Sequence, residues 1–340
     1  MEELVDILVT TYNTNEKYLR KQIESLLKQT HKNIKIYISD DRSTDPKVEK
    51  ILREYEEKDE RIKIYIQPIN LGYNKNFEFL LKKSKADYIM FSDHDDIWHK
   101  DKVEKSLKKI KEENVDMVYC NCRQVDSDGV VLQENYFKYK NVPLVHGKSN
   151  LAISRCVGIG CSQMITKEIR NKMIPFKKWM IAHDWLAAFL ANEGKGMSYI
   201  EEPLFDYRLH NANVFGGRSL NQNLTKWKQE NGGGYESFLN YRKDVITRAY
   251  ADGIKMCKKY VKDDQNTLFM LEAEKYYENL LTTKRFNKDI KTYFKILKGK
   301  NQFKKMIREI ILFHFPILGY VKFAMVKDKN KIKLLNEVKR

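Results

Sequence analysis

Three aspartates and a histidine stand together in the segment Phe91–Trp98, which overlaps the end of the apolar run Tyr88–Phe91. A short apolar run of this kind is typical of a buried strand, so the acids are expected where the strand leaves the sheet. Asp93 and Asp95 are separated by one residue, which lets two carboxylates share a divalent cation such as Mg²⁺ or Mn²⁺. Because the phosphates of a substrate can supply further ligands, the pattern predicts an enzyme that handles a diphosphate.

Similar polar residues follow two other apolar runs. The first predicted strand ends in Thr10–Asn13 and the second in Ser39–Asp45. The carboxyl ends of the strands form the binding edge of an α/β sheet, so we expect both segments beside Asp93. There a hydroxyl, an aromatic ring and a carboxylate can hold a pyrimidine base, the ring by stacking and the carboxylate by accepting from a base N–H. Taken alone, the second segment would more often be a helix-capping turn, but its alignment with the other strand ends favours binding.

The elements that position these residues alternate through the first 120 residues. Apolar runs predict strands at 5–10, 34–39, 62–66, 88–91 and 116–120, and apolar residues at helical spacing predict helices at 19–27, 48–55, 76–83 and 100–112. This alternation predicts an α/β fold with a mostly parallel sheet, flanked by helices and joined by right-handed crossovers. The pattern weakens from 121 to 158 and then resumes as far as about 207.

Composition permits a large enzyme domain with an appendage. The chain has 340 residues, of which 42% are hydrophobic. Its five cysteines are too few and too scattered for a disulfide scaffold, and Cys120 and Cys122 stand closer together than the ligands of a zinc knuckle. The amino terminus carries acids where a secretory signal needs basic residues, and no segment reaches transmembrane length. We therefore expect a cytoplasmic protein.

The formal charge of +17 is unevenly distributed. Residues 1–217 hold 35 Lys and Arg against 33 Asp and Glu, whereas residues 218–340 hold 28 against 13. Glycines at 216–217 and 232–234 bracket a polar stretch that we interpret as a hinge. The predicted organisation is a catalytic domain over 1–217 and a basic helical extension over 218–340. A nucleic-acid partner is not predicted, because the charge lies outside the catalytic domain and no recognised binding motif accompanies it.

The extension contains the apolar segment Ile310–Val321, which basic residues flank on both sides. One interpretation is a peripheral anchor, because apolar burial and attraction to anionic lipids add at a membrane surface. The segment is too short, and too interrupted by His314 and Pro316, for a membrane span, which needs about 20 apolar residues. The alternative, with nearly equal weight, is a core helix that packs back on the domain. Contact between subunits through the C-terminal helices is a further possibility.

The motifs at the strand ends also carry a family resemblance. Four segments resemble, by their order and spacing, family 2 glycosyltransferases of the GT-A fold: Thr10–Asn13, Asp40–Asp45, Asn70–Gly72 and Ser92–Trp98. Within that family the chain is similar to bacterial rhamnosyltransferase-type enzymes that assemble surface polysaccharides. The resemblance covers about residues 4–217. It implies inverting, metal-dependent transfer of a sugar from dTDP-rhamnose or a UDP-hexose to a glycan or lipid-linked saccharide.

The resemblance assigns residues to the donor and to the metal. It places the donor nucleotide against Thr10, Tyr12, Asp41, Asn70, Asn76, Asp93 and Arg208. Asp93 would face the donor ribose or sugar, and Asp95 would reach a Mn²⁺ or Mg²⁺ ion that bridges the diphosphate. His210 would be a further metal ligand, and Arg208 would hold phosphate in a bidentate fork. The alternative for His210 and Arg208 is a surface or salt-bridging role.

Asp184, in the segment Ala182–Trp185, matches the position of the family's catalytic base. Inverting transfer needs one base that takes a proton from the incoming hydroxyl, across the sugar from the leaving diphosphate. The alternative is that His183 and Asp184 only cap the following helix. The resemblance also implies that Gly160 and Trp185 lie on the acceptor side. A glycine there lets the backbone approach a sugar closely, or simply makes a tight turn into the next helix.

Two other classes of function predict sequence features that differ from those of a transferase. A dinucleotide-binding oxidoreductase needs a glycine-rich turn after its first strand, and this chain has Thr10–Asn13 there. The alternative that stays open is a non-catalytic protein of the same fold that binds a nucleotide sugar or a glycan. Such a protein would not need both a metal-binding pair and a downstream acid.

Overall fold

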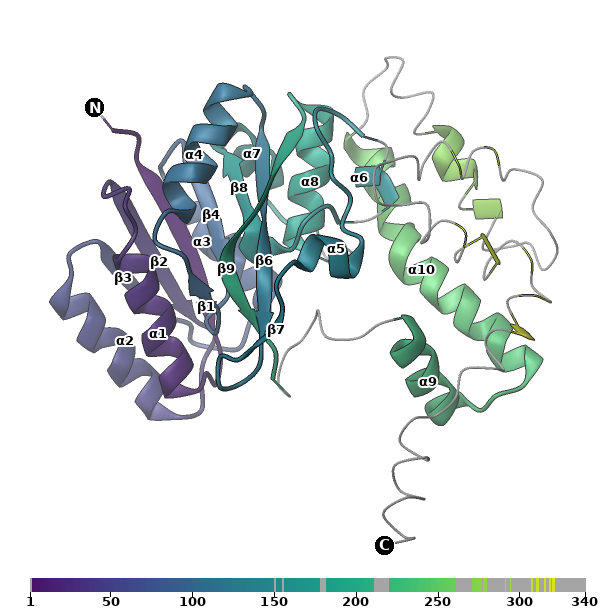
Figure 1. Cartoon of the computed structure of the whole chain (residues 1–340), viewed down its shortest axis with the longest axis horizontal. Helices are drawn as coiled ribbons and strands as arrows, with labels where there is room; N and C mark the ends of the chain where they lie inside the picture. Colours follow the sequence, from purple (N-terminus) through teal and green to yellow (C-terminus); the bar gives the residue numbers. More distant parts are fainter. Residues whose placement is uncertain are drawn as a thin grey trace, which may run out of the picture.

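The computed structural model describes residues 2–149, 151–154, 156–177, 182–210 and 220–260, with single positions and short stretches between 271 and 321. These residues form a central sheet of nine strands, helices on both of its faces, and a helical extension beside it (Figure 1). The order across the sheet is β3-β2-β1-β4-β8-β6-β9-β5, with β7 paired to β6. The α/β class predicted from the sequence is confirmed.

The first half of the sheet is parallel, as the alternation of strand and helix predicts. It consists of β1 (Val5–Thr11), β2 (Ile34–Asp40), β3 (Ile62–Ile66) and β4 (Tyr88–Ser92). Every residue of β1 is buried, which is expected of a central parallel strand covered on both faces. The register pairs Thr11 with Asp40 and Val9 with Ser92, so the polar strand ends meet at one edge of the sheet.

Amphipathic helices cover the two faces (Figure 1). One face carries α1 (Glu16–Leu27), α2 (Pro46–Lys58) and α4 (Lys102–Glu112), and the other carries α3 (Tyr73–Lys83), α7 (Lys167–Met173) and α8 (His183–Glu193). Asn15 and Asp45 cap α1 and α2 by accepting from backbone N–H groups of the first turn. In contrast, α8 is buried on nearly all sides and has no side-chain cap of its own.

The second half of the sheet is mixed, so the antiparallel part of the mostly parallel sheet predicted from the sequence lies here. β8 (Gln163–Thr166) lies antiparallel between β4 and β6 (Met117–Val125), and β9 (Met197–Arg208) runs parallel to β6. Two short strands, β5 (Ile97–Trp98) and β7 (Val131–Gln133), add antiparallel pairs to β9 and β6. The sequence predicts no strand at 163–166, because four residues show too little periodicity and pairing with both neighbours defines the strand.

Five shorter or peripheral elements complete the description: α5 (Tyr136–Lys140), α6 (Leu151–Ser154), the 3₁₀ turn η1 (Gly160–Ser162) and the extension helices α9 (Leu220–Asn231) and α10 (Tyr235–Tyr260). α10 packs against α6 and α8. Its Phe238 and Tyr241 are buried and belong to the same apolar core as the residues of the sheet, so this helix packs onto the domain. The predicted hinge glycines at 216–217 lie outside the described residues.

Half of the positions in the apolar segment 310–321 also lie outside the described residues. Of the positions that are described, Tyr320 packs its ring against Tyr235 of α10, with centroids 5.3 Å apart, whereas Leu318 is 54% exposed. No helix in the described part of the chain combines the length and the hydropathy that crossing a bilayer requires.

Candidate active site

Three aspartates follow β4 at the edge where the parallel strands end. Asp95 and Asp96 are buried, and Asp93 is partly buried. His210, just after β9, places its Nε2 atom 2.6 Å from Oδ2 of Asp95. Its ring stacks on Tyr18 of α1, with centroids 5.6 Å apart. The fold therefore joins the Asp-X-Asp pair to a histidine that is 115 residues away in the sequence.

Burial and mutual repulsion set the protonation of these carboxyl groups. Burial, and after it the charge of Asp95, raises the pKa of Asp93 to about 6. The same two causes raise the pKa of Asp96 well above its ordinary value. Burial also acts to raise the pKa of Asp95, but the charge of His94 and the hydrogen bond to His210 outweigh it and leave that pKa low. A bound cation would relieve the repulsion among these carboxylates.

The donor atoms of this cluster fit a hard divalent cation. Carboxylate oxygens and an imidazole nitrogen are ligands that Mg²⁺ or Mn²⁺ accepts. Ligand atoms of Asp93, Asp96 and Cys161 lie within 4.8 Å of one another. Burial raises the pKa of the Cys161 thiol well above its ordinary value, so the thiol stays protonated and is a poor ligand. The fit therefore rests on the carboxylates of Asp93 and Asp96, which lie close together, and on Asp95, which His210 contacts beside them.

Arg208 lies under the carboxylate loop and is buried. Its Nε donates to the carbonyl oxygen of Asp95 at 2.9 Å, and its Nη1 donates to those of Asp126 and Ser127 at 3.1 and 3.0 Å. The guanidinium also lies over the ring of Tyr18, 4.5 Å from its centroid. These contacts hold the backbone that carries Asp95. Because Nε and Nη1 donate to main-chain carbonyls, these two atoms hold the protein's own backbone, and the phosphate fork implied by the family resemblance stays a prediction.

Asp41 lies at the end of β2 and holds the segment before α3. Its carboxylate accepts from the backbone N–H groups of Leu71 and Gly72, at 2.7 and 2.9 Å. The Nδ2 atom of Asn70 donates to the carbonyl oxygen of Asp41 at 3.0 Å. Burial raises the pKa of Asp41, and the two backbone hydrogen bonds offset only part of that rise. Asp41 and Asn70 are therefore neighbours, as a shared nucleotide site requires.

The other predicted donor residues differ in how far they reach the surface. Tyr12 is 45% exposed at the end of β1, whereas Thr10 is nearly buried. Asn76 is completely buried in α3, and its Nδ2 donates to the carbonyl oxygen of Ser39 at 2.9 Å. Asn76 therefore ties α3 to β2 and does not face a ligand. The sequence analysis also considered the segment Ser39–Asp45 as a helix-capping turn. Within that segment Asp45 does cap a helix, α2.

Asp184 lies in the first turn of α8 and is partly exposed. Its Oδ1 accepts from the N–H of Trp185 at 2.8 Å, which is a local helix-start contact. His183 beside it is buried against Phe77 and Phe91, with ring centroids 4.2 and 4.7 Å away. Neither ring nitrogen of His183 has a hydrogen-bond partner among the described residues. The carboxylate of Asp184 therefore accepts a hydrogen bond at the start of α8 and is also partly open to solvent.

The two residues expected on the acceptor side differ in burial: Trp185 is buried, and Gly160 is partly exposed. Trp185 is buried, and its Nε1 donates to the carbonyl oxygen of Ala152 at 2.8 Å. At Gly160, a Cβ atom would lie 2.8 Å from Nε2 of His183. The space beside this glycine is therefore filled by a histidine ring. The turn η1 leads into strand β8, and not into the helix that the sequence analysis considered.

One short turn links the carboxylate cluster to Asp184. A Cβ on Gly160 would lie 3.5 Å from Cβ of Asp184. The next residue, Cys161, belongs to the group of ligand atoms that includes Asp93 and Asp96. After burial and the charge of Asp95, the charge of Asp184 also contributes to the raised pKa of Asp93. The acid pair and the downstream acid therefore lie on either side of η1, near enough to interact.

Lys102 is a residue that the sequence analysis missed. It is completely buried at the start of α4, and its Nζ donates to the carbonyl oxygen of Cys161 at 2.6 Å. The ammonium lies 3.6 Å from the ring centroid of Trp98 and 4.1 Å from that of Phe205. Burial lowers its pKa. Lys102 thus holds η1 in place through its hydrogen bond to the backbone of Cys161. The sequence gives no signal of this role, because a lysine on an amphipathic helix is usually exposed.

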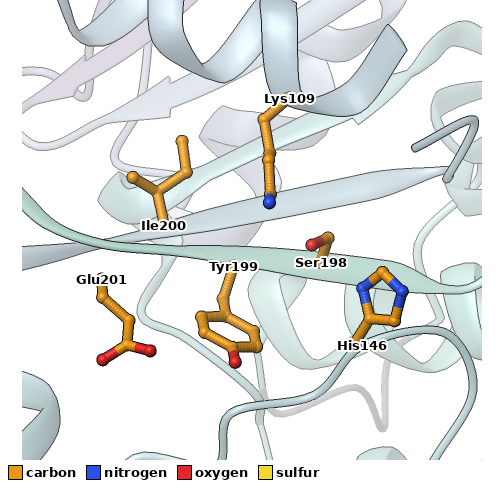
Figure 2. A pocket seen from close by; sticks show the side chains of 6 residues that line it. All are labelled: Lys109, His146, Ser198, Tyr199, Ile200 and Glu201. Atoms are coloured by element: carbon orange, nitrogen blue, oxygen red, sulfur yellow. The ribbon is translucent and has the colours of Figure 1, made fainter. Parts of the chain in front are cut away.

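A hollow of about 360 Å³ lies elsewhere on the domain, between α4 and β9 (Figure 2). Figure 2 shows its lining side chains: Lys109, His146, Ser198, Tyr199, Ile200 and Glu201. It lies toward the edge where β6 and β9 begin, because Met117 pairs with Met197 next to it. The carboxylate cluster lies at the opposite edge, so this hollow is not part of the candidate site.

Comparisons with known proteins agree with this geometry. Residues 6–173 match the family described as Glycosyl transferase family 2. The dTDP-rhamnosyl transferase RfbG of Shigella flexneri is 30% identical over 225 residues, which cover 61% of this chain and 73% of RfbG.

Solved structures show the same fold. Residues 1–349 of Staphylococcus aureus TarS, in complex with UDP-GlcNAc, give a TM-score of 0.53 at 16% identity, covering 97% of this chain and 92% of that one. The mannosyltransferase PcManGT of Pyrobaculum calidifontis, in complex with GDP-Man and Mn²⁺, gives 0.53 at 13% identity, covering 95% and 88%. With its motifs at the strand ends, its GT-A fold and its relationship to RfbG, the chain belongs to glycosyltransferase family 2 and is a glycosyltransferase.

Proposed function

We propose that the chain transfers a hexosyl or rhamnosyl group from a UDP- or dTDP-linked donor to a saccharide or lipid-linked acceptor, with inversion at the anomeric carbon. The observation that carries the proposal is the position of η1, which contacts Asp184 through Gly160 and the carboxylate cluster through Cys161. This supports one cleft in which the leaving group and the attacking hydroxyl meet. The name of RfbG, a dTDP-rhamnosyl transferase, supports a dTDP-linked donor and rhamnosyl transfer.

The donor nucleotide is proposed to bind at the ends of β1 and β2. Tyr12 is exposed there and offers a ring face for stacking on a base. Asp41 and Asn70 lie together beside it and offer a carboxylate and an amide for the edge of the base. Thr10, Tyr12, Asp41 and Asn70 are the proposed nucleotide contacts.

The diphosphate is proposed to lie against Asp93, Asp95 and His210, which would hold Mn²⁺ or Mg²⁺. When bound, such a cation neutralises the negative charge that develops on the departing diphosphate. His210 and Arg208 prepare the site by fixing Asp95, the first through its carboxylate and the second through its carbonyl oxygen. The protein therefore presents the acid pair in a rigid position, so little reorganisation is required during the reaction.

Asp184 is proposed to be the base that accepts the proton of the acceptor hydroxyl. It is partly exposed at the start of α8, across η1 from the acids that face the diphosphate. This placement suits a single displacement, because the base and the leaving group must lie on opposite sides of the donor sugar. No covalent enzyme intermediate is then needed.

The proposal is tested by turnover and by donor binding, measured separately. Thermal shift with UDP, dTDP and GDP sugars, each with and without Mn²⁺, identifies the nucleotide. We expect Asp184→Asn to bind the donor like wild type and to lose turnover. Asp59→Asn is the matched control, because Asp59 pairs with Arg61 at the far end of α2.

Two outcomes would contradict parts of this proposal. Wild-type turnover in Asp184→Asn would remove Asp184 as the base. Tight donor binding without transfer to any supplied saccharide or water would favour the non-catalytic binding protein. Analysis of the anomeric configuration of the product by NMR tests inversion directly.

We further propose that the catalytic domain ends at residue 217 and the basic extension begins at residue 218. We also propose that this extension makes a peripheral contact with anionic membranes. The contact of Tyr320 with α10 supports packing of at least part of the apolar segment against the extension. Flotation of the full chain and of a variant lacking residues 301–340 with anionic vesicles separates the two interpretations. Flotation of the full chain with the vesicles, together with loss of flotation in the shortened variant, would support the anchor.

A further inference from the structure

Helix α8, which carries Asp184, starts without a side-chain cap of its own. Its N-cap residue is Ala182, which has no acceptor beyond the backbone. The first N–H groups of a helix lack intrahelical partners and need an acceptor from elsewhere. The carboxylate of Asp184 accepts from the backbone N–H of Trp185. The N–H of His183 needs another acceptor.

That acceptor comes from a different helix. The Oδ1 atom of Asn74, in the first turn of α3, accepts from the backbone N–H of His183 at 3.1 Å. The two residues are 109 positions apart in the sequence. Asn74 therefore does for α8 what an N-cap asparagine normally does for its own helix.

The first turn of α3 is itself held by the proposed nucleotide site. The carboxylate of Asp41 accepts from the N–H groups of Leu71 and Gly72, directly before α3. Two residues after Asn74, the buried Asn76 ties the same turn to the carbonyl oxygen of Ser39. The position of Asn74 is thus set by the end of β2, where the donor nucleotide is proposed to bind.

Packing reinforces the junction between the two helices. The ring of His183 lies on that of Phe77 of α3, with centroids 4.2 Å apart, and Tyr73 meets it edge-on at 6.3 Å. Apolar packing alone constrains orientation weakly, whereas the hydrogen bond from the N–H of His183 to Asn74 is directional. Together they fix the rotation of α8 about its axis and its position along that axis. The direction in which Asp184 points follows from that placement.

We propose that Asn74 is a positioning residue, which caps α8 from α3 and so sets the position of Asp184 relative to the donor site. The proposal rests on the proposed role of Asp184 as the base. It concerns a residue outside the recognised motifs, since the family resemblance draws attention to Asn76, which is buried and structural. Proton transfer is sensitive to small displacements of the base, so loss of the cap acts on turnover more than on donor affinity.

Two variants of the chain test this proposal, and a third serves as the control. Asn74→Ala removes the acceptor, and alanine is favourable inside a helix, so α3 is expected to form. We expect kcat to fall about tenfold while the donor KM changes less than about twofold. Asn74→Asp keeps an acceptor in the same place and is expected to recover most of the lost kcat. Both are measured with the donor identified by thermal shift.

The control is Ser84→Ala, at the opposite end of the same helix. Ser84 is the C-cap residue of α3, is buried, and donates from Oγ to Oδ2 of Asp6 at 2.7 Å. Its loss is expected to lower the melting temperature as Asn74→Ala does, without lowering kcat. This separates a position-specific effect from a general loss of stability.

Each other outcome overturns the inference. Wild-type kcat in Asn74→Ala shows that the cap does not position the base. A higher donor KM at unchanged kcat makes Asn74 a donor contact instead, and equal losses in the Ala and Asp variants remove the acceptor as the cause. Failure of the proposed base is seen separately, as turnover in Asp184→Asn, whatever the Asn74 variants do.

Discussion

Nε2 of His210 lies 2.6 Å from Oδ2 of Asp95, so a residue two positions past the end of β9 contacts the acidic cluster that begins after β4. This contact joins the last part of the catalytic fold to its acidic loop. It also sets the first prediction, because both side chains are proposed to hold the same cation.

Asp95→Ala is expected to abolish the Mn²⁺-dependent part of UDP binding, and His210→Gln to weaken it about tenfold or more, because each removes a ligand or its partner. Isothermal titration with UDP, with and without EDTA, measures this. His99→Gln is the matched control, since His99 contacts Asp206 and not the cluster. Equal UDP affinity with and without EDTA in wild type would exclude metal-assisted binding.

Replacing Arg208 is expected to destabilise the fold even in the absence of ligand. Arg208→Lys loses the fork that reaches the carbonyl oxygens of Asp95, Asp126 and Ser127, at a cost of about 2–4 kcal/mol. Chemical denaturation of the free protein measures the change. A phosphate-binding arginine would behave differently: the free protein would keep its stability and only donor affinity would fall.

Gly160→Ala is expected to destabilise the protein by about 1–3 kcal/mol and to lower turnover, because the new Cβ would lie 2.8 Å from Nε2 of His183. The same substitution in a His183→Ala background should cost less, and the double-mutant cycle measures the coupling. Gly234→Ala is the control, because nothing lies within 4 Å of a Cβ at that position. Additive effects of the two substitutions would mean that the ring and the glycine do not compete for space.

The ion pair between Arg123 and Asp206 predicts a pH-dependent stability. Arg123 donates from Nε and Nη2 to the two carboxylate oxygens, at 2.7 and 2.9 Å. Burial acts to raise the pKa of Asp206, but hydrogen bonds from His99 and Arg123 outweigh it, so the pKa is lowered. A carboxyl group with a lowered folded-state pKa stabilises the fold above its unfolded-state pKa, near 4, and loses this as the pH falls through the folded value.

Arg123→Met is therefore expected to cost about 1–3 kcal/mol at pH 7 and progressively less below about pH 4. Thermal unfolding from pH 3 to pH 7 measures the difference from wild type. Arg53→Met is the control, because the pair of Arg53 with Glu56 is more exposed and contributes little. A difference that stays constant across this range would show that Arg123 acts through packing and not through charge.

The sequence by itself determined the parallel half of the fold and the identity of the acidic loop. β1 and β4 are apolar and buried along most of their length, and β2 and β3 alternate apolar residues with exposed lysines, so both patterns make the positions of these strands and of their polar ends readable from residue order. The Asp-X-Asp pair stands directly after such a run. Its chemistry follows from local spacing, which sequence records faithfully.

Tertiary structure decided which of the candidate residues face a ligand and which hold the scaffold. Asn76, Arg208 and Trp185 stand in motifs, yet all three are buried and donate to backbone carbonyl oxygens. Lys102 and Asn74 stand in no motif, yet one fixes η1 and the other caps α8. Burial and long-range hydrogen bonds depend on which distant segments come into contact in the folded protein. The residue types along a single segment do not specify those contacts.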